Sequence, residues 1–306
     1  MTLIDITLLT CKKHLQPEPV NQYIQNILDE RMYLQKALEA KGLSVTTRSW
    51  DDPHYDWSQT RAIVFRTIWD YFERYDEFST WLEQLKTKTQ LINPYNLIQW
   101  NIDKHYLADL QSQGIAIVPT VFVDTRSYKS LQSVCKNQGW TDIVIKPAIS
   151  GGALETYKVI EKDRADYEDR FKKLVSERDM LVQPFIKSIT TRGEASLMLF
   201  NGRFTHAILK KAKTGDYRVQ DDYGGTVHPY IPTIEEINFA EHVFACCDPI
   251  PAYGRADIVW DEQGNILLGE LEIIEPELWV RNYPASAEPF AEGVCKYLKI
   301  SRGVRE

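Results

Sequence analysis

Apolar and charged residues alternate in two neighbouring segments, Gly254-Arg-Ala-Asp-Ile-Val-Trp260 and Ile266-Leu-Leu-Gly-Glu-Leu-Glu-Ile273. Such alternation is typical of strands with one buried face, because successive side chains of a strand point to opposite sides. The short linker 261–265 predicts that the two strands form an antiparallel hairpin. The residues expected on its core face are Ala256, Ile258, Trp260, Leu271 and Ile273.

The opposite face of this hairpin gathers charge. It carries Arg255 and Asp257 on one strand and Glu270 and Glu272 on the other, with Asp257 across from Glu270 within about one position of register. Packed carboxylates repel unless a cation neutralises them, and hard oxygen ligands at this density suit Mg²⁺ bound together with phosphates. The alternative is a solvated polar face on which Arg255 pairs with the acids.

A second candidate site surrounds Lys146, which ends the apolar strand of Ile143-Val-Ile-Lys-Pro-Ala-Ile-Ser-Gly-Gly-Ala153. An ammonium group followed by the backbone N–H groups of Ser150, Gly151 and Gly152 can surround a phosphate. The pattern is not the Walker motif, and an ordinary loop is the alternative.

Two further segments can serve a nucleotide. The apolar strand Leu181-Val-Gln-Pro-Phe-Ile186 enters a proline-containing stretch that can present backbone groups to an adenine edge. Glu194 begins the next strand and can accept hydrogen bonds from ribose hydroxyls. The alternatives are an ordinary edge strand or linker and an exposed strand glutamate.

The order of predicted elements divides the chain into three parts. Residues 1–102 alternate strand and helix patterns, which predicts a parallel sheet covered by helices. Arg66 ends one of these strands, where open α/β sheets place ligands. Residues 103–187 form a smaller α+β part. Residues 188–306 are β-rich and include a hairpin around Asn201-Gly202.

Composition narrows the class of protein. A net charge of -7 argues against a broad basic surface for nucleic acid. No apolar run reaches the roughly 18 residues of a membrane span, and the N-terminal residues lack the order of a secretory signal. The five cysteines show no C-x-x-C spacing, which predicts reduced thiols in a cytoplasmic protein. The oligomeric state stays open, with a homodimer as one option.

Taken in order, these elements resemble the ATP-grasp superfamily over about residues 60–295. The resemblance implies an α/β (α+β) ATP-grasp fold with ATP between the middle and C-terminal subdomains. By that resemblance Lys104 and Lys146 bind the phosphates together with Ser150, Gly151 and Gly152. Gln183, Phe185 and Ile186 form the adenine hinge, and Glu194 receives the ribose. Magnesium, with Mn²⁺ as an acceptable substitute, is assigned to Asp257, Glu270 and Glu272, although most relatives have asparagine at the last position.

Two branches of the superfamily look similar. The stretch Lys211–Gly225 is similar to one in glutathione synthetases and in the ligases that add glutamate to ribosomal protein, which places Arg218 near the transferred phosphate. The usual asparagine of that stretch is missing. The segments that look more like the cyclo-ligase of cycloserine biosynthesis are Arg66-Thr-Ile-Trp-Asp-Tyr71, Trp100-Asn-x-Asp-Lys104 and Glu270-Leu-Glu-x-x-Glu-Pro276.

The implied activity is an ATP- and magnesium-dependent ligation of a small-molecule carboxylate to an amine through an acylphosphate, with an amino acid, a peptide or a similar molecule as substrate. ADP and phosphate are released. Ring closure within one substrate and a non-catalytic ATP-binding regulatory protein are the alternatives. The predicted catalytic residues are Arg255, Lys146 and Arg218, and the predicted substrate-binding residues are Arg66, Arg218, Gly225 and Arg255.

Overall fold

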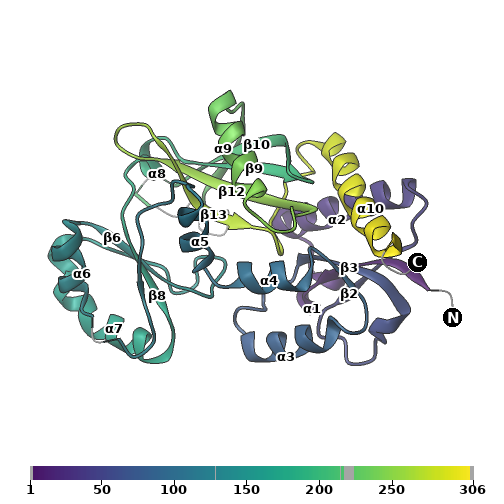
Figure 1. The fold of residues 1–306 in the computed structure, drawn as a ribbon, viewed down its shortest axis with the longest axis horizontal. Coiled ribbons are helices and arrows are strands. Elements are labelled where there is room, and N and C mark those ends of the chain that lie inside the picture. The colour runs from purple at the N-terminus through teal and green to yellow at the C-terminus, as the bar shows by residue number, and fades with distance from the viewer. Residues whose placement is uncertain (1–2, 128, 214, 217–223, 304–306) are drawn as a thin grey trace.

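The protein is represented by a computed structural model that describes residues 3–127, 129–213, 215–216 and 224–303. Within these residues the strands form three sheets, separated along the chain (Figure 1). The N-terminal and middle sheets lie towards opposite ends of the long axis, and the C-terminal sheet lies between them. The α/β prediction is confirmed, and the predicted boundaries at 102/103 and 187/188, which fall between the sheets, stay predictions.

The N-terminal sheet is parallel throughout, as its alternating pattern predicts. Its strands occur in the order β2-β1-β3-β4. They are β1 (Ile4–Thr10), β2 (Val45–Ser49), β3 (Thr60–Thr67) and β4 (Gln90–Ile92). Its helices are α1 (Lys12–Leu15), α2 (Gln22–Ala40), α3 (Tyr75–Leu85) and α4 (Tyr95–Ile102). Helix α2 begins where the Asn21 side chain accepts a hydrogen bond from the N–H of Ile24 at 2.9 Å.

The middle sheet is antiparallel and small, in the order β5-β8-β6-β7. Its strands are β5 (Val121–Val123), β6 (Ile143–Pro147), β7 (Tyr157–Val159) and β8 (Met180–Pro184). The helices of this part are α5 (Tyr106–Ser112), α6 (Leu131–Gln138) and α7 (Arg164–Glu177). Side chains of α6 and α7 share a core with β6 and β8, whereas those of α5 pack against the C-terminal sheet.

The C-terminal sheet is antiparallel and contains both predicted hairpins, in the order β11-β10-β9-β12-β13. Its strands are β9 (Glu194–Phe200), β10 (Arg203–Lys211), β11 (Thr226–Tyr230), β12 (Tyr253–Trp260) and β13 (Ile266–Glu272). Each hairpin contains one register shift, between Phe204 and His206 in the first and between Asp257 and Ile258 in the second. In the second, Ile258 pairs with Leu268 but Asp257 pairs with Glu270, so Gly269 is an extra, bulged residue.

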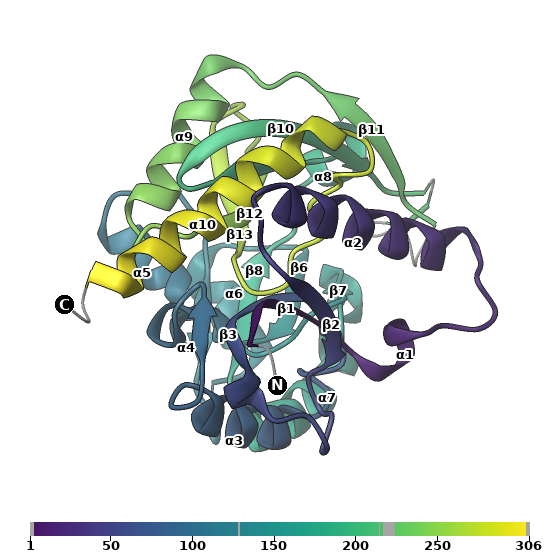
Figure 2. The ribbon, with the colours of Figure 1, turned by 90° about the vertical axis from the view of Figure 1, so that its right-hand side faces the viewer.

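The remaining helices are α8 (Ser188–Thr191), α9 (Ile234–Ala245) and α10 (Ala287–Gly303). Helix α10 returns to the N-terminal part and lies beside α2 (Figure 2). Phe290 and Val294 of α10 share one core with Leu34 of α2 and Ile6 of β1. The two ends of the chain therefore pack into the same unit. No helix in the described ranges is long and apolar enough to cross a bilayer.

Side chains cover the outer edge of β13. The Asn101 amide donates to the carbonyl of Leu271 at 2.8 Å and accepts from the N–H of Ile273 at 3.2 Å. The hydroxyl of Tyr106 accepts from the N–H of Leu271 at 2.9 Å. These bonds satisfy an edge that would otherwise be open, and they fix the strand that carries Glu270 and Glu272.

A buried histidine makes stability depend on pH. His206 is 5% exposed, and its Nε2 donates to the carbonyl of Leu278 at 2.7 Å. Burial lowers its pKa from 6.5 to about 4. The unfolded chain therefore binds more protons than the native chain between these values, and stability falls as the pH drops from about 6.5 towards 4.

Between pH 7 and pH 4.5 the free energy of unfolding of the wild type should fall by about 2–3 kcal/mol more than that of His206→Gln, as measured by urea unfolding. The amide of glutamine can still donate to Leu278 but does not titrate. The exposed His228 of β11 supplies the matched control, His228→Gln. Equal losses in wild type and His206→Gln would show that other groups control the acid transition.

Candidate active site

The polar face of the C-terminal sheet brings the predicted acids together. Asp257 lies opposite Glu270, and Arg255 lies opposite Glu272, so these four side chains share one face of β12 and β13. On the other side of β12, Asp257 pairs with Ser196 of β9. The core face predicted for this hairpin is also confirmed, because its five apolar side chains lie in one buried cluster.

Asp257 is the centre of a buried ion network. It is 3% exposed, and Arg255 donates to both of its oxygens at 2.8 Å. Ser196 donates to Asp257 at 2.5 Å, and Lys210 lies 3.2 Å from it. Burial opposes ionisation, but Arg255 and Lys210 outweigh it and hold the pKa of Asp257 well below its usual range. Asp257 is thus an anion in the folded protein.

The two glutamates of β13 also face cations. Glu272 pairs with Arg255, and burial, opposed by Arg255, raises its pKa to about 7. Glu270 lies 3.3 Å from Lys104. Burial would raise the pKa of Glu270, but Lys104 and Lys146 outweigh it and hold the pKa below its usual value. The repulsion expected for three packed carboxylates is therefore offset within the protein by positive side chains.

Lys104 links the acids to the predicted phosphate loop. Its side chain is 6% exposed, and Nζ donates to the carbonyl of Ser150 at 2.5 Å. Its main-chain N–H donates to the carbonyl of Ala148 at 3.0 Å. Lys146 is half-buried on β6, where burial, opposed by Glu270, lowers its pKa. Both predicted lysines therefore act electrostatically on Glu270.

The acids fit magnesium by donor chemistry rather than by a preformed cage. Among the described residues, the one group of three acid or histidine side chains whose ligand atoms all lie within 4.8 Å of one another is Asp103, His105 and Asp179, not the predicted set. Mg²⁺ usually keeps several waters and binds through one or two carboxylates plus phosphates. A patch of carboxylates beside two lysines suits that mode, and the ligand roles of the predicted acids stay a prediction.

The predicted adenine and ribose residues are distant from the acids in sequence. They lie on or directly after β8 of the middle sheet and at the start of β9 of the C-terminal sheet. Gln183 is 6% exposed on β8 and donates to the Thr120 hydroxyl at 2.9 Å. The N–H of Phe185 donates to the carbonyl of Asp142 at 2.8 Å, and the carbonyl of Ile186 accepts from the N–H of Ile189 at 3.2 Å. Both backbone groups already form hydrogen bonds within the protein, so fewer groups of the hinge are left to bind adenine.

Glu194 has a partner that the sequence pattern did not single out. It forms an ion pair with Lys210, the residue opposite it on β10. Gly193, just before it, has φ +106, and a Cβ there would lie 2.4 Å from the carbonyl of Lys210. Only glycine fits this close approach. Lys210 thus joins Glu194 to Asp257 through an ion pair with each.

The predicted glycine loop contacts the N-terminal part. A Cβ at Gly151 would lie 2.5 Å from the ring of Phe72. We expect Gly151→Ala to weaken binding of an ATP analogue by up to about tenfold, because the ring or the loop must shift. Titration calorimetry measures this. The double variant Gly151→Ala, Phe72→Ala should recover most of the affinity, and equal weakening in single and double variants would contradict the contact.

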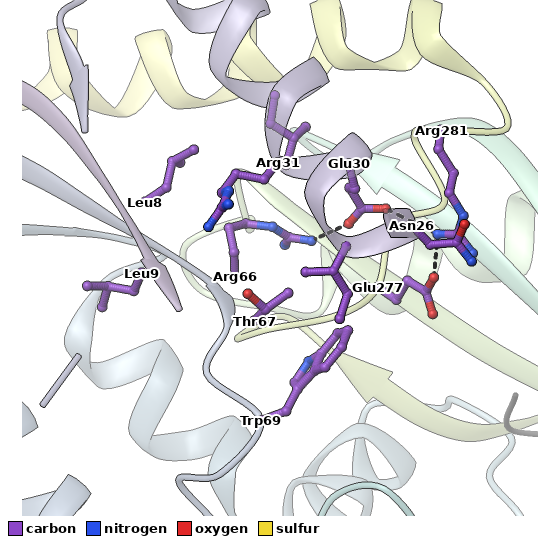
Figure 3. Close-up of a pocket in the computed structure, with 12 residues that line it drawn as sticks. Leu8, Leu9, Asn26, Glu30, Arg31, Arg66, Thr67, Trp69, Glu277 and Arg281 are labelled. Atoms are coloured by element: carbon purple, nitrogen blue, oxygen red, sulfur yellow. Dashed lines mark hydrogen bonds and ion pairs between the residues drawn. The ribbon is translucent and has the colours of Figure 1, made fainter. Parts of the chain in front are cut away.

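Arg66 lies in a separate pocket at the carboxyl ends of β1 and β3 (Figure 3). It is 4% exposed and donates to Glu30 at 2.8 Å and to the carbonyl of Pro276 at 2.6 Å. Its Nη1 has no hydrogen-bond partner among the described residues. Glu277 and Arg281, which form an ion pair, line the same pocket. Because Arg255 donates to the carbonyl of Glu277 at 3.1 Å, this pocket adjoins the acid patch.

Two predicted residues lie at the edge of what the structure describes. Arg218 falls within residues 217–223, outside the described ranges. Gly225 is half-buried and immediately precedes β11, whose first residue, Thr226, pairs with Lys211. Their substrate-binding roles stay predictions.

Known proteins match this chain both in sequence and in structure. Residues 6–93 match the sequence family described as the N-terminal domain of D-cycloserine synthetase DcsG. The cycloserine biosynthesis protein DcsG of Streptomyces lavendulae is 29% identical over 288 residues, which span 87% of this chain and 93% of that protein. The crystal structure of D-cycloserine synthetase DcsG matches with a TM-score of 0.83 at 26% identity, over 96% of this chain and 99% of that one.

More distant structures share the fold. A D-alanine–D-alanine ligase from Bacillus anthracis matches with a TM-score of 0.65 at 14% identity, over 99% of this chain and all of that one. The ATP-grasp ligase PsnB, solved with precursor peptide PsnA2 and AMPPNP, matches with a TM-score of 0.61 at 13% identity, over 98% of this chain and all of that one. The predicted ATP-grasp fold is confirmed. The chain therefore has the fold of ATP-grasp ligases and is similar to D-cycloserine synthetase over nearly its whole length.

Proposed function

We propose that the chain joins a small-molecule carboxylate to an amine at the expense of ATP, through an acylphosphate, and acts on an amino acid or a similar molecule. The observation that carries this proposal is the register of β12 and β13, which sets Asp257 opposite Glu270 and Arg255 opposite Glu272. Lys104 and Lys146 lie beside these acids. Such a patch can hold both the cations and the anions of a metal–triphosphate complex.

In this proposal Lys104 and Lys146 neutralise charge on the ATP phosphates while the substrate carboxylate attacks the γ-phosphorus, since phosphoryl transfer depends mainly on positioning and electrostatics. Asp257, Glu270 and Glu272 would hold magnesium, which supplies charge neutralisation at the phosphate oxygens when bound. The glycine loop at Ser150–Ala153 would cover the phosphates, and the contact of Lys104 with Ser150 supports this role.

Arg255 is suited to stabilise the oxyanion that forms when the amine attacks. A guanidinium has five N–H donors. Four of them are directed at Asp257, Glu272 and the carbonyl of Glu277. The second N–H of Nη1 has no partner among the described contacts. The other four N–H groups hold the side chain in position. A fixed donor of this kind costs little reorganisation when charge develops.

Ring closure within one substrate is the second candidate. The similarity to a cycloserine biosynthesis protein over most of both chains favours it. The mass of the product distinguishes the two, because cyclisation consumes one organic substrate and ligation consumes two.

No disulfide joins any of the five cysteines, all of which lie in described residues, and this supports a cytoplasmic location.

The test is a screen of amino acids and dipeptides for ADP release, with and without hydroxylamine. At least one carboxylate should raise ADP release, and hydroxylamine should convert the acylphosphate to a hydroxamate. If ATP binds while no carboxylate raises ADP release, the proposed ligation is wrong and a non-catalytic ATP-binding role becomes the better explanation.

A further inference from the structure

Glu275 is the acid of this region that lacks a cation. It lies three residues after Glu272 and is half-buried. Among the described residues it forms no ion pair, whereas each of the other acids of the patch and the adjoining pocket does. The pairs are Asp257–Arg255, Glu270–Lys104, Glu272–Arg255, Glu194–Lys210, Glu30–Arg66 and Glu277–Arg281. A carboxylate left alone in such a set is available to a ligand.

The position of Glu275 is fixed from the N-terminal part. The indole N–H of Trp69 donates to the carbonyl of Glu275 at 2.9 Å. Arg66 donates to the carbonyl of Pro276, the next residue, at 2.6 Å. Tyr71, a buried residue of the same segment, lies close enough to influence the pKa of the Glu275 carboxyl. Trp69 and Arg66 thus hold the backbone at Glu275 and Pro276, and Tyr71 lies near the carboxyl group.

The surroundings of Glu275 favour a positively charged or proton-donating ligand. Burial and the neighbouring Glu272 raise the pKa of Glu275 to about 8, against the influence of Tyr71 and Lys104. A carboxyl group that is desolvated and lies beside a second carboxylate is stabilised when a ligand brings positive charge or an N–H donor.

We propose that Glu275 binds the nitrogen nucleophile of the ligation and accepts its proton, an inference that rests on the proposed function. The amine, in its neutral form, directs one N–H at the carboxylate of Glu275. As its lone pair forms the bond to the acyl carbon, the bond from that carbon to the phosphate oxygen breaks and inorganic phosphate leaves. The N–H proton passes to Glu275. Trp69 and Tyr71 act as positioning residues because they reach the amine only through Glu275.

The test uses Glu275→Gln with the carboxylate identified by the ADP-release screen. Amide formation should fall at least about a hundredfold, which is the low end for loss of a general base. Hydroxamate formation with hydroxylamine should stay within about threefold of wild type, because this nucleophile is uncharged near neutral pH and is supplied in excess. Binding of MgADP, measured by calorimetry, should be unchanged. Glu275→Asp should recover part of the amide formation, and Glu73→Gln, at an exposed acid beside the same segment, is the matched control.

Two results would overturn the assignment of Glu275. One is amide formation at the wild-type rate in Glu275→Gln. The other is an equal loss of hydroxamate and amide, which would place Glu275 in carboxylate activation instead. Failure of the proposed function looks different, because the wild-type protein itself would then form neither ADP nor hydroxamate with any carboxylate.

Discussion

Asp257→Asn is expected to reduce ATP turnover about a thousandfold if Asp257 holds magnesium as proposed, since loss of such a charge costs several kcal/mol in the transition state and each 1.36 kcal/mol is about tenfold in rate. The substitution also leaves Arg255 and Lys210 buried with less opposing charge. Breaking a buried pair from one side costs about 3–5 kcal/mol. Here Glu272 and Glu194 remain as partners, so the loss of folding stability should lie near the lower value.

The measurement combines ADP release with urea unfolding. Glu262→Gln serves as the control, because Glu262 lies on the turn of the same hairpin and pairs only at the surface with Lys187. It should change turnover little and stability by less than about 1 kcal/mol. Full turnover in a folded Asp257→Asn protein would mean that the acid patch is a solvated polar face on which Arg255 pairs with the acids.

Glu30→Gln is expected to lower the free energy of unfolding by about 3–5 kcal/mol. Glu30 is 6% exposed on α2, and it accepts hydrogen bonds from Arg66 and from the N–H groups of Leu278 and Val280, the last two at 3.2 Å. Between those two residues Trp279 has φ +47, an uncommon conformation for a residue with a side chain. The carboxylate of Glu30 thus compensates a buried guanidinium and holds a strained turn.

Urea unfolding of Glu30→Gln beside Glu39→Gln measures this effect. Glu39 lies on the exposed side of the same helix, so its substitution controls for loss of one α2 carboxylate and should cost less than about 1 kcal/mol. If Glu30→Gln were equally mild, the amide would have replaced the carboxylate at all three donors, and Arg66 would not need the buried negative charge.

Local patterns were sufficient for the elements with strong periodicity. The alternation in β12 and β13 predicted which side chains face the core, and Asn201-Gly202 predicted the turn that joins β9 and β10. Elements with little alternation were missed, among them β2, β5 and β11, because their stability comes from partners distant in the chain.

Side-chain partners depended on features that a local pattern does not reveal. An unbroken register from Arg203↔Phe200 would place Leu209 opposite Glu194. The shift near His206 places Lys210 there instead, on the same face as Asp257. The burial of Glu30 was equally hidden, since a glutamate on a surface helix is normally solvated. Its partners, at Arg66 and residues 278–280, come from two distant segments.

The bulge at Gly269 corrects the alternation of β13 by one residue. Cross-strand partners point to the same side of a sheet, and an unbulged register continued from Ile258 and Leu268 would set Glu270 opposite Ala256, on the core face. Deletion of Gly269 would remove the extra residue and leave Asp257 opposite Glu270 in regular pairing. A homologue that is one residue shorter at this point would therefore keep the acid patch, so an alignment gap here is not a sign that the chemistry has been lost.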